Sequence, residues 1–420
     1  MNSSRNVLGA VIAVTAVIGG LLASPGALAG EQDSYLSSPS KGGIWRFDAQ
    51  TGQVTPFALG LGIPFYGFFE PGGDLIIPDR LFGAVFRIDP TGAISIVSAA
   101  GLLSSVVTAT PAPGGGLAAS DLPSNRVVHV DTQTGQQTLI HDEFTSGGLL
   151  VGPGGLAYAP DGALYVANNV GNTIVRIAPD GAISTFSDSP LIQTPGGVAI
   201  DGAGNLFCAM YASDRIVRFR LDTGEAEVFA GPHPMMKSPN DLKLSRSGGL
   251  LTTTRNSSLL RIDATGQIDV LLHDPTLGEI DGIAVPEDAT PCSGTFVTYG
   301  VGTAGPSQLP PRLSALFSPC PGADVALEFR GVAPGAPTAL FIGTAPANLP
   351  FYGGTLLVNP AGPFVVVPFT HPGGDLVLPF TLASDPLWIG AQLFLQYATA
   401  EPTAPQGVAL STGLHETIGT

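Results

Sequence analysis

Residues 153–177 read PGGLAYAPDGALYVANNVGNTIVRI, and residues 195–219 read PGGVAIDGAGNLFCAMYASDRIVRF. In both stretches three short apolar runs are separated by segments rich in Gly, Asp and Asn. Apolar runs broken by such turn residues are typical of antiparallel strands joined by hairpins. The pattern starts at residue 153 and again at residue 195, so the chain repeats one structural unit of about 42 residues.

The third run of each unit carries a marker residue, usually Arg, followed by a Thr-Gly or Asp-Gly turn and a fourth apolar run. We expect the marker to be a structural side chain. Four strands per unit, repeated six times, predict a six-bladed β-propeller in which each four-stranded sheet is one blade. The marker occurs at Arg46, Arg87, His129, Arg176, Arg218 and Arg261.

The two ends of the repeat region predict how the ring closes. The chain begins the repeats with only an outer hairpin, residues 43–57, and leaves them with only an inner hairpin, residues 281–300. Together these halves make one blade, and such pairing removes the open sheet edge. The sequence therefore predicts a propeller over residues 38–304 with two-plus-two strand closure.

Composition changes after a Pro-rich linker near residue 305, and about seven short apolar strands follow between Pro and Gly turns. This spacing predicts a β-sandwich over residues 305–420 and an all-β fold class for the whole chain. We expect a structural or adhesive module there, with carbohydrate binding as the alternative.

The charge and the N-terminus bear on location. The formal net charge is -16, which excludes the basic footprint that nucleic-acid binding needs. Residues 1–29 have the pattern of a signal peptide: Arg5, an apolar run from Val7 to Ala23, and small residues at the cleavage site. No second apolar span follows, so we expect a secreted or periplasmic protein without a membrane span after cleavage. In an oxidising compartment Cys292 and Cys320 are the natural disulfide pair, whereas Cys208 lies in an apolar strand.

The two quoted stretches resemble the propeller group that includes NHL repeats, the SMP-30/gluconolactonase family and virginiamycin-B-lyase-like proteins. The likeness covers roughly residues 42–300. The tail resembles C-terminal modules of secreted bacterial proteins.

Ligand sites in propellers lie where the innermost strand begins and the second strand ends, because both ends meet at one mouth of the central channel. Oxygen-bearing side chains at such a mouth suit Ca²⁺ or Mg²⁺. They also cap turns by hydrogen bonding to backbone N–H groups, and we expect this role for most of them. Aligning the repeats places at the mouth Tyr66, Asp79, Asp121, Asn168, Asn240, Asp241 and Asp281, with Glu279 nearby.

The segments SPNDLKLSRSGG and EIDGIAV resemble metal-ligand strands of the SMP-30 family, which implies Asn240 and Asp281 as ligands of a divalent cation. Tyr66 stands where that family has a Glu, so a third ligand would have to be Asp79 or Glu279. The virginiamycin lyase group uses His at the mouth, and no His stands at a predicted start of an innermost strand here.

Three functions follow as hypotheses. The first is an exported scaffold that binds a small molecule, a glycan or a protein at the mouth. The second is an SMP-30-like metal-dependent hydrolase of lactones or small esters. The third is an extracellular structural or surface protein.

Overall fold

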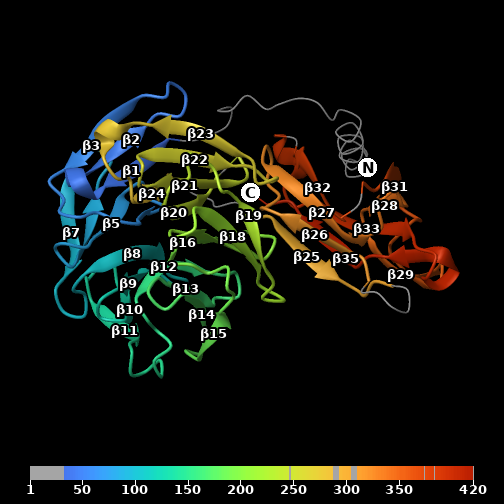
Figure 1. The fold of residues 1–420 in the computed structure, drawn as a ribbon, viewed down its shortest axis with the longest axis horizontal. Coiled ribbons are helices and arrows are strands. Elements are labelled where there is room, and N and C mark those ends of the chain that lie inside the picture. The colour runs from blue at the N-terminus through green and yellow to red at the C-terminus, as the bar shows by residue number, and fades with distance from the viewer. Residues whose placement is uncertain are drawn as a thin grey trace. The chain divides into compact units, whose positions relative to one another are not determined.

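A computed structural model describes residues 33–245, 247–286, 293–303, 310–372, 374–382 and 384–419. Apart from four 3-10 turns (Pro39–Lys41, Pro275–Leu277, Pro386–Trp388 and Pro405–Gly407), its regular elements are all strands. The chain forms two compact units (Figure 1). The first covers Gly26–Ile200 and Gly204–Ala289, and the second covers Thr290–Thr420 with the short segment Asp201–Ala203.

Five blades of the first unit are consecutive four-stranded antiparallel sheets, which confirms the repeat. Three of them are β4 (Phe68–Phe69), β5 (Leu75–Asp79), β6 (Ala84–Ile88) and β7 (Ile94–Ala99); β8 (Val106–Pro111), β9 (Leu117–Asp121), β10 (Arg126–Val130) and β11 (Gln137–His141); and β12 (Pro153–Tyr158), β13 (Leu164–Asn168), β14 (Thr173–Ile177) and β15 (Ile183–Ser187). The other two are β16 (Pro195–Ile200), β17 (Asn205–Met210), β18 (Arg215–Arg220) and β19 (Ala226–Ala230); and β20 (Pro239–Leu244), β21 (Leu250–Thr254), β22 (Ser258–Ile262) and β23 (Ile268–His273).

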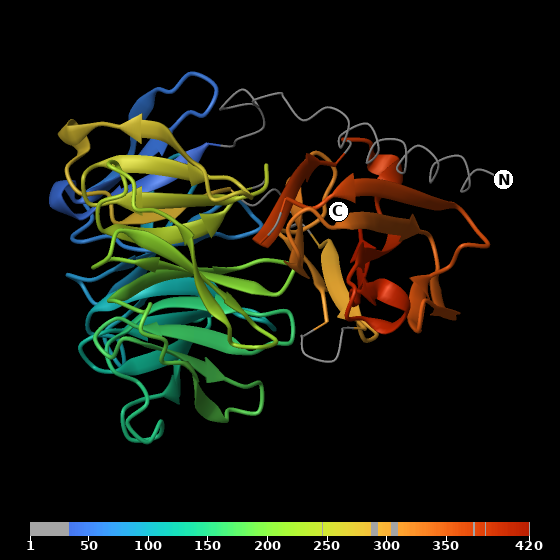
Figure 2. The ribbon, with the colours of Figure 1, turned by 45° about the vertical axis from the view of Figure 1, so that its right-hand side comes forward.

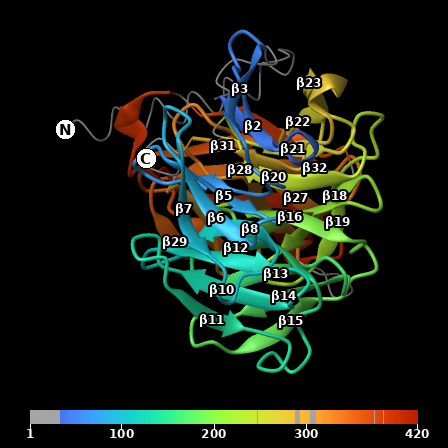
Figure 3. The same ribbon diagram turned by 90° about the vertical axis from the view of Figure 1, so that its left-hand side faces the viewer.

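The sixth sheet of the first unit joins its two chain ends. Its order is β24 (Gly282–Ala284), β1 (Ser34–Ser38), β2 (Gly43–Phe47) and β3 (Val54–Leu59). Around the unit each innermost strand contacts the next, and β24 contacts β4, so the contacts return to their start. The blades can be followed from blue through green to yellow in Figure 2 and Figure 3.

The joining sheet corrects the predicted two-plus-two closure. Its second strand is β1, which pairs with β24 on one side and β2 on the other. Three strands therefore come from the N-terminal end and one from the C-terminal end. The other strand of the expected inner hairpin, β25 (Thr295–Tyr299), pairs with β35 (Gly413–Thr417) in the second unit. The prediction missed β1 because residues 34–38 lack the Gly-rich start of the other inner hairpins.

Packing follows the strand order within each blade. In the third blade, β13 is buried along its whole length, whereas most residues of the outer strand β15 are half-buried or exposed. Neighbouring blades share their cores, since Tyr165 of one blade and Val198 and Phe219 of the next belong to one cluster. The Arg markers pair with nearby carboxylates, as between Arg176 and Asp161 at 2.9 Å, which agrees with a structural role.

The second unit contains the expected sandwich of two sheets. A common core joins residues of both sheets, for example Leu327 and Phe329 with Leu340 and Tyr397. The Tyr397 hydroxyl donates a hydrogen bond across the core to the carbonyl of Arg330 at 2.6 Å. One sheet holds β25, β35, β33 (Gln392–Ala400), β28 (Pro337–Gly343), β31 (Phe364–Thr370) and β34 (Val408–Leu410); the other holds β26 (Arg312–Leu316), β27 (Asp324–Val332) and β32 (Gly374–Thr381); a separate hairpin is β29 (Pro346–Phe351) and β30 (Gly354–Val358).

Because β25 belongs to this unit, the boundary between the units lies near residue 290 and not at residue 304. Cys208 is buried with a free thiol, as expected. Cys292 lies outside the described residues, as does the signal peptide at 1–29, so the Cys292–Cys320 bond and export stay predictions. Within the part of the chain that is described, no helix is long and apolar enough to cross a membrane.

Candidate functional site

The strand register of the propeller defines the mouth. In three successive blades the first residue of the innermost strand lies opposite the last residue of the second strand, as Pro153 does with Asn168. The loops that enter innermost strands and leave second strands therefore share one end of the blades. We call this end the mouth; the turns between innermost and second strands lie at the opposite end.

Asp79 ends a second strand, and it serves the loops around it. Its Oδ2 accepts a hydrogen bond from the N–H of Gly62 at 2.7 Å, and its Oδ1 accepts from Ile63, Leu81 and Phe82 at 3.0–3.1 Å. The side chain is fully buried. Both carboxylate oxygens are thus occupied by backbone donors.

Asp121 and Asn168 occupy the same position in the next two blades, and they also hydrogen-bond the backbone of nearby loops. Asp121 accepts from the backbone N–H of Ser105 at 2.9 Å, and Asn168 bonds both the N–H of Val151 at 3.2 Å and the carbonyl of Leu149 at 2.7 Å. Each side chain ties the loop that enters its own innermost strand to the end of the second strand. These contacts agree with the expected capping role.

A different set of mouth residues forms a chain of side-chain contacts across three blades. The Tyr66 hydroxyl donates to Oδ1 of Asn240, and the Asn240 side chain in turn lies beside the Asp281 carboxyl and lowers its pKa. All three side chains are buried, with exposed fractions of 3%, 7% and 5%. Sequence alignment placed all three at starts of innermost strands, and the structure brings them together.

Asp241 ties neighbouring innermost strands together. Its Oδ1 accepts from the N–H of Leu242 at 2.8 Å, and its Oδ2 accepts from the N–H of Ile283 on β24 at 3.0 Å. Burial raises the pKa of Asp241, against the lowering effect of these backbone donors. Asp241, which was predicted as a mouth residue, therefore has a structural role: it holds β20 and β24 together next to Asn240 and Asp281.

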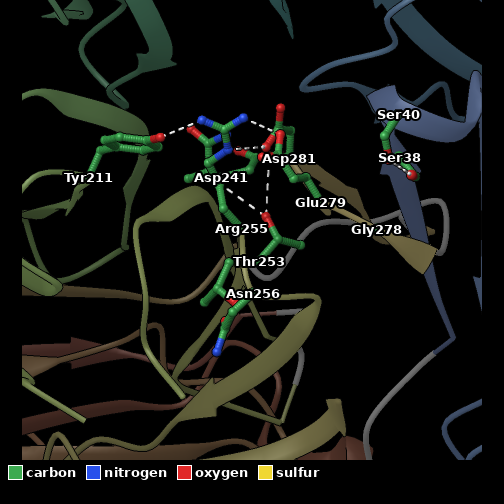
Figure 4. A network of polar contacts seen from close by, with 12 residues as sticks. Ser38, Ser40, Tyr211, Asp241, Thr253, Arg255, Asn256, Gly278, Glu279 and Asp281 are labelled. Carbon is green, nitrogen blue, oxygen red and sulfur yellow. Dashed lines mark hydrogen bonds and ion pairs between the residues drawn. The ribbon is translucent and has the colours of Figure 1, made fainter. Parts of the chain in front are cut away.

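Arg255 completes the site, and the sequence analysis did not identify it. It follows the last residue of β21, and its guanidinium lies between Tyr211 and the acidic pair Glu279 and Asp281 (Figure 4). Nη1 donates to the Tyr211 hydroxyl at 2.5 Å, Nη2 donates to Glu279, and Nε lies 3.9 Å from Oδ1 of Asp281. The guanidinium also lies 5.7 Å from the centre of the Tyr211 ring, within range of a cation–π contact.

The electrostatics of Asp281 reflect these neighbours. Burial raises its pKa, and the hydrogen bond from Asn240 and the positive charge of Arg255 act in the opposite direction. Burial likewise raises the pKa of Tyr66 well above its usual value, so the hydroxyl stays protonated and can act as the donor to Asn240.

The predicted metal ligands do not fit a divalent cation in this arrangement. Oδ1 of Asn240 is already an acceptor for Tyr66, Glu279 is paired with Arg255, and Asp79 is bonded to backbone N–H groups. The guanidinium beside Asp281 adds a positive charge where the cation would lie. The described residues contain no group of three or more His, Cys, Asp or Glu side chains placed to hold a metal ion.

A simple signal would have identified Arg255 from the sequence. The last residue of a second strand points into the blade as a cap, so the following residue is the first that is free to face the mouth. In successive blades that following position holds Arg80, Leu122, Asn169, Tyr211 and Arg255. The alignment of the repeats took the last residue of each second strand as the mouth residue, and therefore chose the position one residue before Arg255.

Pairs of glycines lie near the starts of β12 and β16, and close packing explains three of these four residues. A Cβ on Gly196 would lie 2.5 Å from the carbonyl oxygen of Asn240, and one on Gly197 would lie 2.6 Å from the nitrogen of Leu242. A Cβ on Gly155 would lie 2.3 Å from the carbonyl oxygen of Gly196. Innermost strands β12, β16 and β20 thus approach one another through backbone atoms.

No protein-family model and no curated protein matches the chain. Among solved structures, a chain in a nidogen/laminin complex is 17% identical, with 61% of this chain and 98% of that chain covered and a TM-score of 0.53. A protein of unknown function from Bacteroides caccae is 16% identical, with 61% and 100% covered and a TM-score of 0.50. A gluconolactonase of Xanthomonas campestris is 17% identical, with 62% and 86% covered and a TM-score of 0.49. At these identities the matches bear on the fold alone, and the match to the chain of the nidogen/laminin complex agrees with the propeller group that the repeat resembles.

Proposed function

We propose that this protein is an exported binding scaffold, which recognises a small molecule, a glycan or a protein at the mouth of its propeller. The observation that carries the proposal is the contact chain from Tyr66 through Asn240 to Asp281, closed by Arg255. Most of its polar atoms pair with one another, and Oδ1 of Asp281 keeps a free acceptor position toward the mouth. Convergent polar groups are what selective binding requires.

The proposal is tested by binding to immobilised arrays of peptides and oligosaccharides. Glu279→Lys reverses a half-exposed charge at the mouth, and Asp161→Lys reverses a comparably exposed charge at the opposite end of the blades. We expect at least one ligand class to bind the parent protein and Asp161→Lys, and to lose binding to Glu279→Lys. Ligands that are affected equally by both variants, or an array without any ligand, would contradict the proposal.

The metal-dependent hydrolase is a second candidate because one observation favours it. Oδ1 of Asp281 is buried and has no hydrogen-bond partner among the described residues, so it has spare capacity as an acceptor. Elemental analysis of the purified protein, with melting curves in millimolar Ca²⁺ and Mg²⁺, separates the two functions. A bound metal, and a rise in melting temperature that Asp281→Asn abolishes, would support the hydrolase. Unchanged curves would leave the scaffold as the function.

A further inference from the structure

The carboxyl group of Asp281 is nearly closed off from solvent and yet incompletely satisfied. The residue is 5% exposed, and its Oδ1 has no hydrogen-bond partner among the described residues. A buried carboxylate oxygen without a donor costs free energy, because it has lost its hydration without gaining a partner. A donor that reached this oxygen would therefore gain more than an ordinary surface hydrogen bond.

Arg255 lies over this oxygen without bonding it well. Its Nε is 3.9 Å from Oδ1, beyond hydrogen-bond distance, while Nη1 and Nη2 donate to Tyr211 and Glu279. The Arg255 side chain is 39% exposed and follows the end of β21 in a short loop. It can therefore swing into solvent at the modest cost of two partly exposed contacts.

The walls around the guanidinium suit a cation. Asp281 and Glu279 supply negative charge on one side, and the Tyr211 ring supplies a π face on the other. The other arginine whose charge acts on Asp281 is Arg80, which is held elsewhere, over the Phe65 ring and within 3.3 Å of the Ser105 hydroxyl. Two carboxylates and an aromatic face form a common recognition set for guanidinium and ammonium groups.

We propose that the mouth binds an organic cation, a guanidinium or primary ammonium group, which takes the place of Arg255 against Asp281, Glu279 and Tyr211. This inference rests on the proposed scaffold function and names the ligand chemistry for it. Arg255 then acts as an internal competitor that keeps the acidic pair neutralised until the ligand arrives. The protein's net charge of -16 adds long-range attraction for such ligands.

The same chemistry can come from a free amine or from a Lys or Arg side chain of a polypeptide. Exposed apolar side chains on loops at the mouth end favour the polypeptide, because they offer contacts to residues on either side of the basic one. These side chains are Leu81 and Phe82, which follow Arg80, the arginine whose charge acts on Asp281. Substituting Phe82, which is 55% exposed, therefore distinguishes the two sources.

The test is calorimetric titration with agmatine, using the neutral N-butylurea as control and a capped Leu-Arg-Leu peptide for the second source. We expect agmatine, and not butylurea, to bind the parent protein. Arg255→Ala removes the internal competitor and should bind agmatine at least about tenfold more tightly. Arg255→Ala combined with Asp281→Asn should lose that gain. If the natural ligand is a polypeptide, Phe82→Ser should weaken binding of the peptide and leave binding of agmatine unchanged.

Equal binding of butylurea, or agmatine binding that Asp281→Asn leaves unchanged, would overturn the proposal. If Arg255→Ala does not fold, the parent protein still decides, because saturating agmatine should shift the NMR signal of the Arg255 Nε–H, and an unmoved signal counts against displacement. Array ligands that depend on Glu279 while agmatine fails to bind would refute the cation site and leave the scaffold function standing.

Discussion

At the scale of single residues, two aspartates of the mouth show how position decides the role of one side chain. Asp79 ends a strand where four backbone N–H groups converge, and its carboxylate is used up in holding loops. Asp281 precedes a strand, its own backbone is held by Ser37 and Thr253, and its carboxyl faces the mouth with an acceptor to spare. The first aspartate is therefore a structural cap, and the second is available to a ligand.

Glu416 carries the clearest pH dependence in the chain. It lies in β35 of the second unit, is 2% exposed, and its Oε1 has no hydrogen-bond partner among the described residues. Burial raises its pKa from 4.5 to about 8. Between these values the unfolded chain has released a proton that the folded protein retains, so folding stability falls as the pH rises from about 4.5 to 8.

Glu416→Gln should abolish this loss, because glutamine does not ionise. We expect the variant to equal the parent near pH 4.5 and to exceed it by on the order of 5 kcal/mol above pH 8, from about 1.4 kcal/mol per pKa unit. The effect is measured by unfolding the protein in urea across this pH range and following the fluorescence of the second unit. Glu143→Gln, at an exposed site, is the control and should change nothing. Parallel pH profiles for Glu416→Gln and the parent would contradict the assignment.

Much of the site could be predicted from residue types, and the rest depended on register. Tyr66, Asn240 and Asp281 follow from aligning the starts of innermost strands, since equivalent positions around a ring meet at its axis. Arg255 did not follow, because it lies one residue beyond the strand end that the alignment used. Hydrogen-bond partners also could not be predicted from the sequence. No pattern in it indicates that the Tyr66 hydroxyl donates to the side-chain oxygen of Asn240.

At the scale of elements, hairpin turns fix the blades and glycines fix the spacing between them. Asp48, Asp89, Asp131 and Asp263 accept backbone N–H bonds in the turns between third and fourth strands, which is why the Asp and Thr-Gly signals located those strands. The Gly pairs that begin β12 and β16 act between blades. Their effect could not be predicted from hairpin patterns, because it depends on the neighbouring blade.

Gly197→Ala should destabilise the propeller by about 1–3 kcal/mol, as overpacking does in a close-packed core. The added Cβ would lie 2.6 Å from the nitrogen of Leu242 and 2.8 Å from the Cα of Asp241, both of which are backbone atoms that yield poorly. Gly72→Ala is a matched control, because its Cβ would have nothing within 4 Å. Thermal unfolding should separate the two variants by several degrees, and equal melting temperatures would show that β16 and β20 have room to move apart.

At the scale of the whole molecule, the repeat count could be read from the sequence but the closure could not. Six marker residues correspond to six four-stranded sheets among the described residues. The sequence analysis placed β25 in the propeller, because an apolar strand at the expected spacing has the same sequence pattern in the propeller as in the sandwich. Only pairing shows that β25 joins β35 and that β1 fills the vacant place beside β24.

The closure makes an N-terminal truncation informative. If residues 43–57 supplied the whole N-terminal share of the joining blade, a chain beginning at Gly42 would be as stable as one beginning at Gly30. In the structure β1 is the second strand of that blade, paired on both sides, with Leu36 only 1% exposed. Its removal would leave β24 and β2 with unpaired edges, and we expect aggregation or a much lower melting temperature.

A milder variant tests the same closure without cutting the chain. Leu36→Ala should cost about 2–5 kcal/mol, because it leaves a cavity between β1 and the shared core of the joining blade and its neighbour. Leu59→Ala, at a leucine of β3 in the same blade that is 58% exposed, should change stability by no more than about 0.5 kcal/mol. Size-exclusion chromatography and thermal unfolding of the truncated chain and both variants provide the measurement. A truncated monomer that melts with the parent, together with a harmless Leu36→Ala, would mean that β1 does not hold the ring closed.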